Sequence, residues 1–142
     1  MPKTILIIDD EKTIRWSLAE AIAAAGYETV DADTAADGIA KFRDASPDLV
    51  LLDMKLPDGS GLDVLKMLKS EDPTVPVVIM TAYAEVETAV EAMKSGAYDF
   101  VAKPYSVDKL RVTISNALEN QRLKNEIAYL RSSSTGNAFF KQ

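Results

Sequence analysis

The stretch Leu49-Val50-Leu51-Leu52 is a short, continuous apolar run that ends at a carboxylate, Asp53. A second run of this kind, Val77-Val78-Ile79-Met80, ends at Thr81. Neither run alternates apolar with polar residues, as a strand with one face in water would. Both are therefore predicted to be strands buried on two faces, as in a parallel sheet. Three further candidate strands are residues 5–8, a weaker 28–32, and 100–102.

Helix-length segments lie between these strands. In the first segment, apolar residues recur at three- and four-residue spacing and Gly26 follows as a natural helix stop; they are Ile14, Leu18, Ala21, Ile22 and Ala25. Similar patterns occupy residues 36–42, 62–68 and 86–93. Because strand and helix alternate along the chain, the pattern predicts right-handed crossovers and a doubly wound, parallel α/β sheet.

Composition narrows the possible functions. The chain has 142 residues, the length of one domain, and a net charge of -6 from 16 Lys and Arg against 22 Asp and Glu. With no Cys and no His, it can use only carboxylates, hydroxyl groups and lysines for chemistry. The acidic balance argues against direct nucleic-acid binding, which needs a cationic face. No apolar run approaches the roughly 18 residues of a membrane span, and no signal sequence is recognisable, so we expect a cytoplasmic domain.

The chain changes character after Pro104, since residues 107–131 contain no Gly or Pro. The first half of this segment carries one apolar stripe that can dock on the sheet: Leu110, Ile114, Ala117 and Leu118. In the second half the spacing becomes three, four and three, as in a coiled-coil seam with Asn at an a position: Asn120, Leu123, Ile127 and Leu130. This seam favours a parallel two-stranded coiled coil, although the same residues could instead complete the domain's own core.

The chain is therefore expected to have three parts. Residues 1–119 form the domain, and residues 120–131 form a coiled-coil linker helix that makes the chain a homodimer. Residues 132–142 are expected to be a flexible tail, because they begin with Ser132-Ser133-Ser134-Thr135-Gly136.

Polar side chains follow the predicted strands at their carboxyl ends, where open α/β sheets bind ligands. The first strand is followed by Asp9 and Asp10, the third by Asp53, the fourth by Thr81 and the fifth by Lys103. Adjacent strands lie about 4.8 Å apart, so these groups can converge on one small volume. Crowded carboxylates need a cation, and oxygen ligands without His or Cys point to Mg²⁺ before Ca²⁺.

The same residues indicate where a phosphoryl group would reside. The chain lacks both glycine-rich phosphate loops, GxGxxG and GxxxxGK[ST]. A phosphoryl group is therefore expected to sit on the protein itself, and Asp is a known covalent acceptor. Each residue also has a structural alternative: an Asp after a strand is commonly a cap or turn residue, Thr81 can cap a helix, and Lys103 can be a surface charge. Their shared position at the strand ends favours the functional interpretation.

Four motifs stand in order at these strand ends: Ile8-Asp9-Asp10-Glu11, Leu52-Asp53-Met54-Lys55-Leu56-Pro57-Asp58-Gly59-Ser60-Gly61, Met80-Thr81-Ala82-Tyr83 and Gly96-Ala97-Tyr98-Asp99-Phe100-Val101-Ala102-Lys103-Pro104. Together they resemble the receiver domain of two-component response regulators, over about residues 3–118. Two further stretches resemble receivers of the NtrC-type, sigma-54-dependent activators: Arg15-Trp16-Ser17-Leu18 and Glu85-Val86-Glu87-Thr88-Ala89-Val90. In such activators an ATPase domain and a DNA-binding domain follow the receiver.

The resemblance implies a fold and a set of roles. The fold is a five-stranded parallel sheet of order 2-1-3-4-5 with an extended C-terminal helix. Asp53 would accept a phosphoryl group from a sensor histidine kinase. Mg²⁺ would be bound directly by Asp10 and Asp53, by the carbonyl group of Lys55, and by Asp9 mostly through water. Lys103 would contact a phosphoryl oxygen, and the Lys103–Pro104 peptide bond would be cis.

The resemblance also implies a switch. The hydroxyl group of Thr81 would bond to the phosphoryl group, and Phe100 would rotate inward into the space that Thr81 leaves. Many receivers have Tyr at the position of Phe100. Because Phe has no hydroxyl group, Phe100 is expected to contribute to the switch only through packing and not through a hydrogen bond. Lys55 and Tyr83 would flank the entrance and tune autodephosphorylation. The output would be a change in how the linker helices pair.

Two other functions fit part of the pattern. A phosphatase of the haloacid dehalogenase type also uses an Asp at a strand end, but it needs a second Asp two residues later, where this chain has Lys55. A pseudo-receiver would keep the fold as a binding module without phosphorylation. Its usual sign is the loss of an acid or of the Lys, and this chain retains Asp9, Asp10, Asp53 and Lys103.

Overall fold

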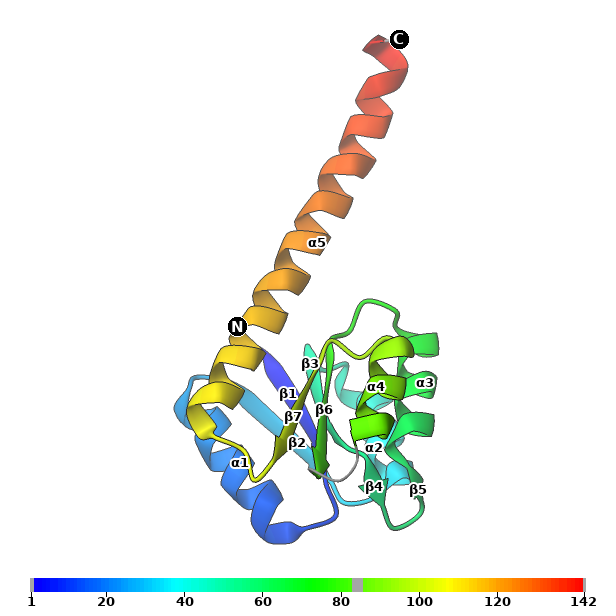
Figure 1. The fold of residues 1–142 in the computed structure, drawn as a ribbon. Helices are drawn as coiled ribbons and strands as arrows, with labels where there is room; N and C mark the ends of the chain where they lie inside the picture. The colour runs from blue at the N-terminus through cyan, green and yellow to red at the C-terminus, as the bar shows by residue number, and fades with distance from the viewer. Residues whose placement is uncertain (1, 83–85, 142) are drawn as a thin grey trace.

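The computed structural model describes residues 2–82 and 86–141. Its centre is a five-stranded parallel sheet with the order β2-β1-β3-β6-β7 (Figure 1). The strands are β1 (Thr4–Ile8), β2 (Glu28–Ala32), β3 (Leu49–Asp53), β6 (Val77–Ala82) and β7 (Asp99–Lys103). Counted along the chain, these strands have the order 2-1-3-4-5, so the predicted fold is confirmed.

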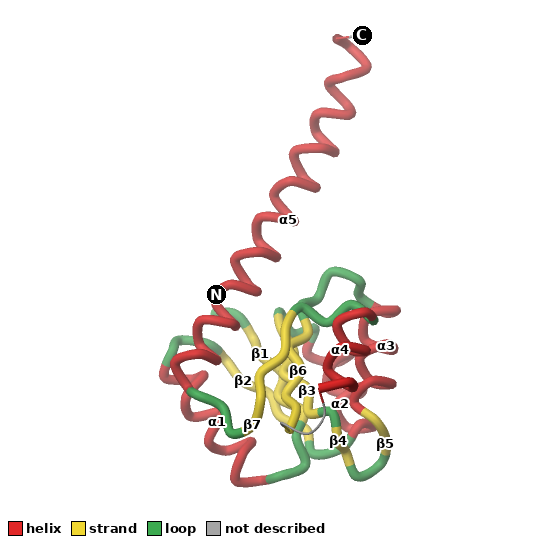
Figure 2. Tube along the Cα trace, in the orientation of Figure 1, coloured by secondary structure: helices red, strands yellow, loops and turns green. Residues whose placement is uncertain are grey.

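Helices cover both faces of the sheet (Figure 2). They are α1 (Lys12–Ala24), α2 (Ala35–Ala45), α3 (Gly61–Glu71), α4 (Val86–Lys94) and α5 (Val107–Lys141). Successive strand residues point to opposite faces. In β1, Ile5 and Ile7 therefore pack with α1 and α5, whereas Leu6 and Ile8 pack with α2, α3 and α4. Both faces of the sheet are buried under helices, which explains why the central strands are apolar at every position instead of alternating with polar residues.

A small hairpin that was not predicted from the sequence follows β3. Strands β4 (Lys55–Leu56) and β5 (Gly59–Ser60) pair antiparallel. At the tip of the hairpin, the carboxylate of Asp58 accepts hydrogen bonds from the backbone N–H groups of Ala35, at 2.7 Å, and Ala36, at 3.0 Å. These bonds lower the pKa of Asp58 and fasten the hairpin to the N-terminus of α2.

Helix α5 is much longer than the sheet and projects from the domain (Figure 1). Its first half buries Leu110, Ile114 and Ala117 against the sheet, as the apolar stripe predicted. Within the described residues, no helix is both long and apolar enough to cross a membrane.

The structure differs from the sequence-based expectation at the C-terminal end. The segment expected as a flexible tail, residues 132–142, continues α5 as far as Lys141. No Pro follows Pro104 to stop the helix. Ser, Thr and Asn weaken a helix only slightly, and even Gly136 costs only about 1 kcal/mol relative to Ala.

Candidate functional site

Three carboxylates meet at the carboxyl edge of the sheet. Asp9 follows β1, Asp53 ends the neighbouring strand β3, and Asp10 is the next residue after Asp9. Their candidate ligand oxygens all lie within 4.8 Å of one another. The register of β1 and β3 pairs Ile8 with Leu52, so the residues that follow this pair, Asp9 and Asp53, reach the same level. The structure thus brings together the acids that the sequence placed at separate strand ends.

A single ammonium group lies between two of these acids. Lys103 Nζ is 3.1 Å from Asp9 Oδ2 and 3.2 Å from Asp53 Oδ2. Asp9 is fully buried, Asp53 is 7% exposed, and the Lys103 side chain is 19% exposed. Burial by itself lowers the pKa of Lys103, but the charges of Asp53 and Asp9 outweigh it and raise that pKa overall. The Lys103–Pro104 peptide bond is cis, as the resemblance implied.

The positive charge of Lys103 does not fully offset the negative charges of the carboxylates around it. The pKa of Asp53 is raised, first because burial disfavours its charged form and also because Asp9 repels it. Lys103 and the Lys55 N–H group, 3.3 Å from Asp53 Oδ1, act in the opposite direction without cancelling the effect. An all-oxygen donor set with excess negative charge fits a hard divalent cation such as Mg²⁺.

A recess of about 270 Å³ gives access to this cluster. Its lining includes Asp10, Asp53, Lys55 and Lys103, so Lys55 lies beside the site as expected. Such a recess accommodates a small group such as a phosphoryl group, together with an ion, rather than a large organic ligand.

The two predicted switch residues lie on adjacent strands. Thr81 is buried near the end of β6, and its hydroxyl group donates to the carbonyl group of Ala82 at 3.3 Å. Phe100 is exposed on β7. Tyr83, expected to flank the entrance, lies outside the described residues.

Gly61, at the start of α3, has a role at the site that was not predicted from the sequence. A Cβ atom on Gly61 would lie 2.6 Å from Met54 Cα and closer still to the carbonyl oxygen of Asp53. The N–H group of Gly61 donates to the carbonyl group of Met54 at 2.9 Å, and Met54 in turn donates to Met80 at 3.2 Å. The first turn of α3 therefore supports the backbone that carries Asp53. The glycine eight residues after Asp53 was the available signal for this close approach.

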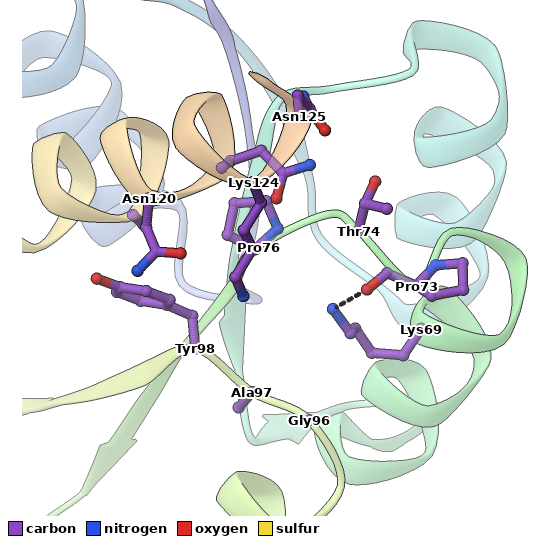
Figure 3. A pocket seen from close by; sticks show the side chains of 12 residues that line it. Lys69, Pro73, Thr74, Pro76, Gly96, Ala97, Tyr98, Asn120, Lys124 and Asn125 are labelled. Atoms are coloured by element: carbon purple, nitrogen blue, oxygen red, sulfur yellow. Dashed lines mark hydrogen bonds between the residues drawn. The ribbon is translucent and has the colours of Figure 1, made fainter. Parts of the chain in front are cut away.

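The residues predicted to form a dimer seam lie beyond the docked half of α5. Leu123, Ile127 and Leu130 are 45%, 48% and 53% exposed, respectively. Asn120, predicted on the same seam, lines a separate recess of about 450 Å³ between α5 and the loops before β6 and β7. There it points toward Tyr98 (Figure 3). The three apolar side chains therefore remain uncovered within the described chain.

The amino-acid sequence of this chain is similar to those of known signalling proteins. The response regulator receiver domain family matches residues 5–115. The regulatory protein AtoC of Escherichia coli (strain K12) is 44% identical over 126 residues, which are 89% of this chain and 27% of AtoC. The DNA-binding transcriptional regulator NtrC of Proteus hauseri is 36% identical over 118 residues, 83% of this chain and 25% of NtrC. The chain thus spans about a quarter of the length of these relatives.

Solved structures agree with the sequence matches. NtrX from Brucella abortus superposes with a TM-score of 0.87 at 39% identity, over 92% of this chain and 30% of NtrX. A response regulator receiver domain protein from Clostridium thermocellum superposes with a TM-score of 0.82 at 34% identity, over 85% of this chain and 98% of that protein. The predicted fold and the predicted resemblance, including its NtrC-type character, are both confirmed.

Proposed function

The chain belongs to the response regulator receiver domain family, and we propose that it is a phosphoacceptor in which Asp53 takes a phosphoryl group from a histidine of a sensor kinase. The observation that carries this proposal is the ammonium group of Lys103, held 3.1 Å from Asp9 and 3.2 Å from Asp53. A buried carboxylate beside a fixed cation is suited to receive a phosphoryl group, because the cation can contact a phosphoryl oxygen as the new bond forms.

The transfer step involves few groups of this chain. A carboxylate oxygen of Asp53 attacks phosphorus, and a P–O bond forms while the P–N bond to the kinase histidine breaks. The imidazole leaves with the bonding electron pair and takes up a proton. Lys103 holds a phosphoryl oxygen throughout, and water later hydrolyses the acyl phosphate. The domain therefore catalyses its own phosphorylation and dephosphorylation but turns over no separate substrate.

Asp10, Asp53 and the carbonyl group of Lys55 would hold Mg²⁺, and Asp9 would act mostly through water. When bound, Mg²⁺ supplies positive charge at the transferring phosphoryl oxygens. Three carboxylates whose oxygens lie within 4.8 Å of one another support this assignment. The raised pKa of Asp53 supports it as well. Burial and the charge of Asp9 both disfavour the carboxylate form of Asp53, and a bound cation would stabilise that form.

The switch follows from the added charge. An aspartyl phosphate adds roughly -1.5 to -2 charges and strong acceptor oxygens. Thr81 would exchange its long bond to the neighbouring Ala82 carbonyl group for a bond to the phosphoryl group. Phe100, now exposed, would turn inward into the vacated space. The surface formed by α4, β7 and α5 would change and act on the linker helices.

We assign residues 1–119 to the phosphoacceptor domain and residues 120–131 to a linker that pairs with a second copy of the chain. Leu123, Ile127 and Leu130 are exposed on a helix that has already left the sheet, and a second copy would cover them. In the full-length protein, the switch would regulate a sigma-54-dependent ATPase and DNA-binding module. The family membership leaves no reason to retain the phosphatase alternative.

Intact-protein mass spectrometry after incubation with acetyl phosphate and Mg²⁺ tests the proposal. The expected result is one added phosphoryl group on the wild type and none without Mg²⁺. The control is Asp53→Asn, which keeps the size of the side chain but is expected to gain no phosphoryl group.

The absence of an adduct on the wild type would leave two explanations, rapid hydrolysis or a pseudo-receiver. A titration with beryllofluoride, a stable phosphoryl mimic, separates them. Binding would indicate rapid hydrolysis, and the absence of binding would refute the proposed phosphoacceptor.

A further inference from the structure

Every backbone and carboxylate group of Asp9 is engaged in a hydrogen bond. Its N–H group donates to the carbonyl group of Ala32 at 3.1 Å. Its Oδ1 accepts from the N–H group of Glu11 at 2.9 Å, and its Oδ2 from Lys103 at 3.1 Å. Its carbonyl oxygen accepts from Arg15 Nη1 at 2.8 Å. The last bond is notable because Arg15 does not line the recess of the proposed site.

The guanidinium group of Arg15 bridges two elements. While Nη1 holds the carbonyl group of Asp9, Nε donates to Asp31 Oδ2 on β2 at 3.1 Å. The Arg15 side chain is only 15% exposed, although that of Asp31 is 56% exposed. A planar guanidinium fork fixes direction as well as distance, which a flexible lysine ammonium group does not.

The bond to the Asp9 carbonyl group has a consequence for Asp10. The carbonyl group of Asp9 and the N–H group of Asp10 belong to one rigid peptide plane. Arg15 thereby sets the direction in which the backbone enters Asp10, and so the direction in which the Asp10 side chain leaves. Asp10 is exposed, so packing around its side chain contributes little to its orientation.

We propose that Arg15 is a positioning residue of the metal site, holding the Asp9–Asp10 peptide so that the Asp10 carboxylate stays beside Asp53. This inference rests on the proposed function, since it assumes that the acids hold Mg²⁺. Groups that orient metal ligands change metal affinity by 10- to 100-fold when they are removed.

A positioning role and a purely electrostatic role of Arg15 predict opposite effects of its removal on Mg²⁺ affinity. A guanidinium group near the acids would, through its charge alone, repel a divalent cation, so its removal would tighten Mg²⁺ binding. If Arg15 positions Asp10, its removal weakens binding instead. The sign of the change therefore distinguishes the two roles.

The test is a titration with MgCl₂, followed through the amide chemical shifts of Asp53 and Lys55. We expect Arg15→Gln to raise the Mg²⁺ dissociation constant roughly tenfold. Arg15→Lys should raise it as well, because it keeps the charge but loses the fork. The matched control is Arg43→Gln, which removes the same charge from another fork, where Arg43 donates to Glu71 through two bonds of 2.9 Å. The control should bind Mg²⁺ like the wild type. Unchanged or tighter binding in Arg15→Gln, or wild-type binding in Arg15→Lys, would overturn the proposal.

Amide hydrogen exchange in EDTA provides a readout without metal. We expect the amide of Glu11, which donates to Asp9 Oδ1 at 2.9 Å, to exchange faster in both Arg15 variants, while the amides of β1 and β3 stay protected and show that the domain is folded. Unchanged exchange at Glu11 would refute the positioning role. If the wild type itself bound no Mg²⁺, the metal site of the proposed function would fail, and the exchange rates would still decide whether Arg15 holds the loop.

Discussion

Replacing Gly61 with alanine should destabilise the domain, because α3 begins in contact with the backbone that carries Asp53. The added Cβ would lie 2.6 Å from Met54 Cα and closer still to the Asp53 carbonyl oxygen. Both are backbone atoms, and Met54 is tied on its other side to Met80 by a hydrogen bond of 3.2 Å. No side chain can rotate away to relieve this contact, so either α3 or the Asp53 segment must move.

Two terms set the size of the effect. Forcing an extra carbon into filled space costs about 1–3 kcal/mol. Alanine in place of glycine stabilises a helix interior by about 1 kcal/mol, and by less at the first helical position. The expected net loss is about 1–2 kcal/mol of the free energy of unfolding, a substantial part of the 5–15 kcal/mol that is typical of a domain.

Urea unfolding in EDTA at pH 7, followed by far-ultraviolet circular dichroism, measures this loss. The matched control is Gly59→Ala, where the new Cβ would meet only Ala35 Cβ at an ordinary 3.9 Å. That variant should stay within about 0.5 kcal/mol of the wild type. If Gly61→Ala were as stable as Gly59→Ala, the close approach of α3 to the Asp53 backbone would not constrain the domain, and the reasoning would be wrong.

Three other changes test separate features. Lys103→Gln should lower the free energy of unfolding of the metal-free protein, measured in urea, by about 2–3 kcal/mol. This loss is smaller than for a fully buried ion pair because the Lys103 side chain is 19% exposed. A loss below about 1 kcal/mol would show that Lys103 does not stabilise the two carboxylates in this way. Asp58→Asn should destabilise the domain at pH 7. Because the folded-state pKa of Asp58 lies below the ordinary value of 3.8, the stability from its carboxylate is present above that pH and is lost as pH falls through the lowered pKa. The variant should therefore approach the wild type in acid, and an equal difference at pH 7 and pH 3 would exclude this explanation. Leu123→Arg with Ile127→Arg should halve the molar mass measured by light scattering, whereas Tyr129→Arg, exposed but off the seam, should not. An unchanged mass in the double variant would exclude dimerisation through the seam.

The fold could be predicted from the sequence because its cause is local. A strand buried on both faces must be apolar at every position, so the runs around Leu51 and Ile79 were recognisable without any partner. The strand ends were equally visible, because each apolar run stops at a polar residue. The positions of Asp53 and Lys103 at the ends of β3 and β7 follow from that pattern.

Other features could not be predicted, because the pattern that signals them is short or ambiguous. The β4–β5 hairpin has only two residues in each strand, too few for a periodic pattern. The helix through residues 132–141 has a composition typical of a linker, and propensities alone do not decide between helix and coil. The role of Gly61 depends on the path of a different segment, around Met54.

By itself, the sequence determined which residues could reach the carboxyl edge of the sheet, since side-chain alternation and strand length depend only on neighbours along the chain. The tertiary structure decided how these residues share their charges. One ammonium group serves Asp9 and Asp53, although Lys103 is distant from both in sequence. It also decided that Arg15, on α1, holds the backbone next to Asp10. Such contacts depend on the register and spacing of elements that meet only after folding, and hydrogen bonds require distances within a few tenths of an ångström.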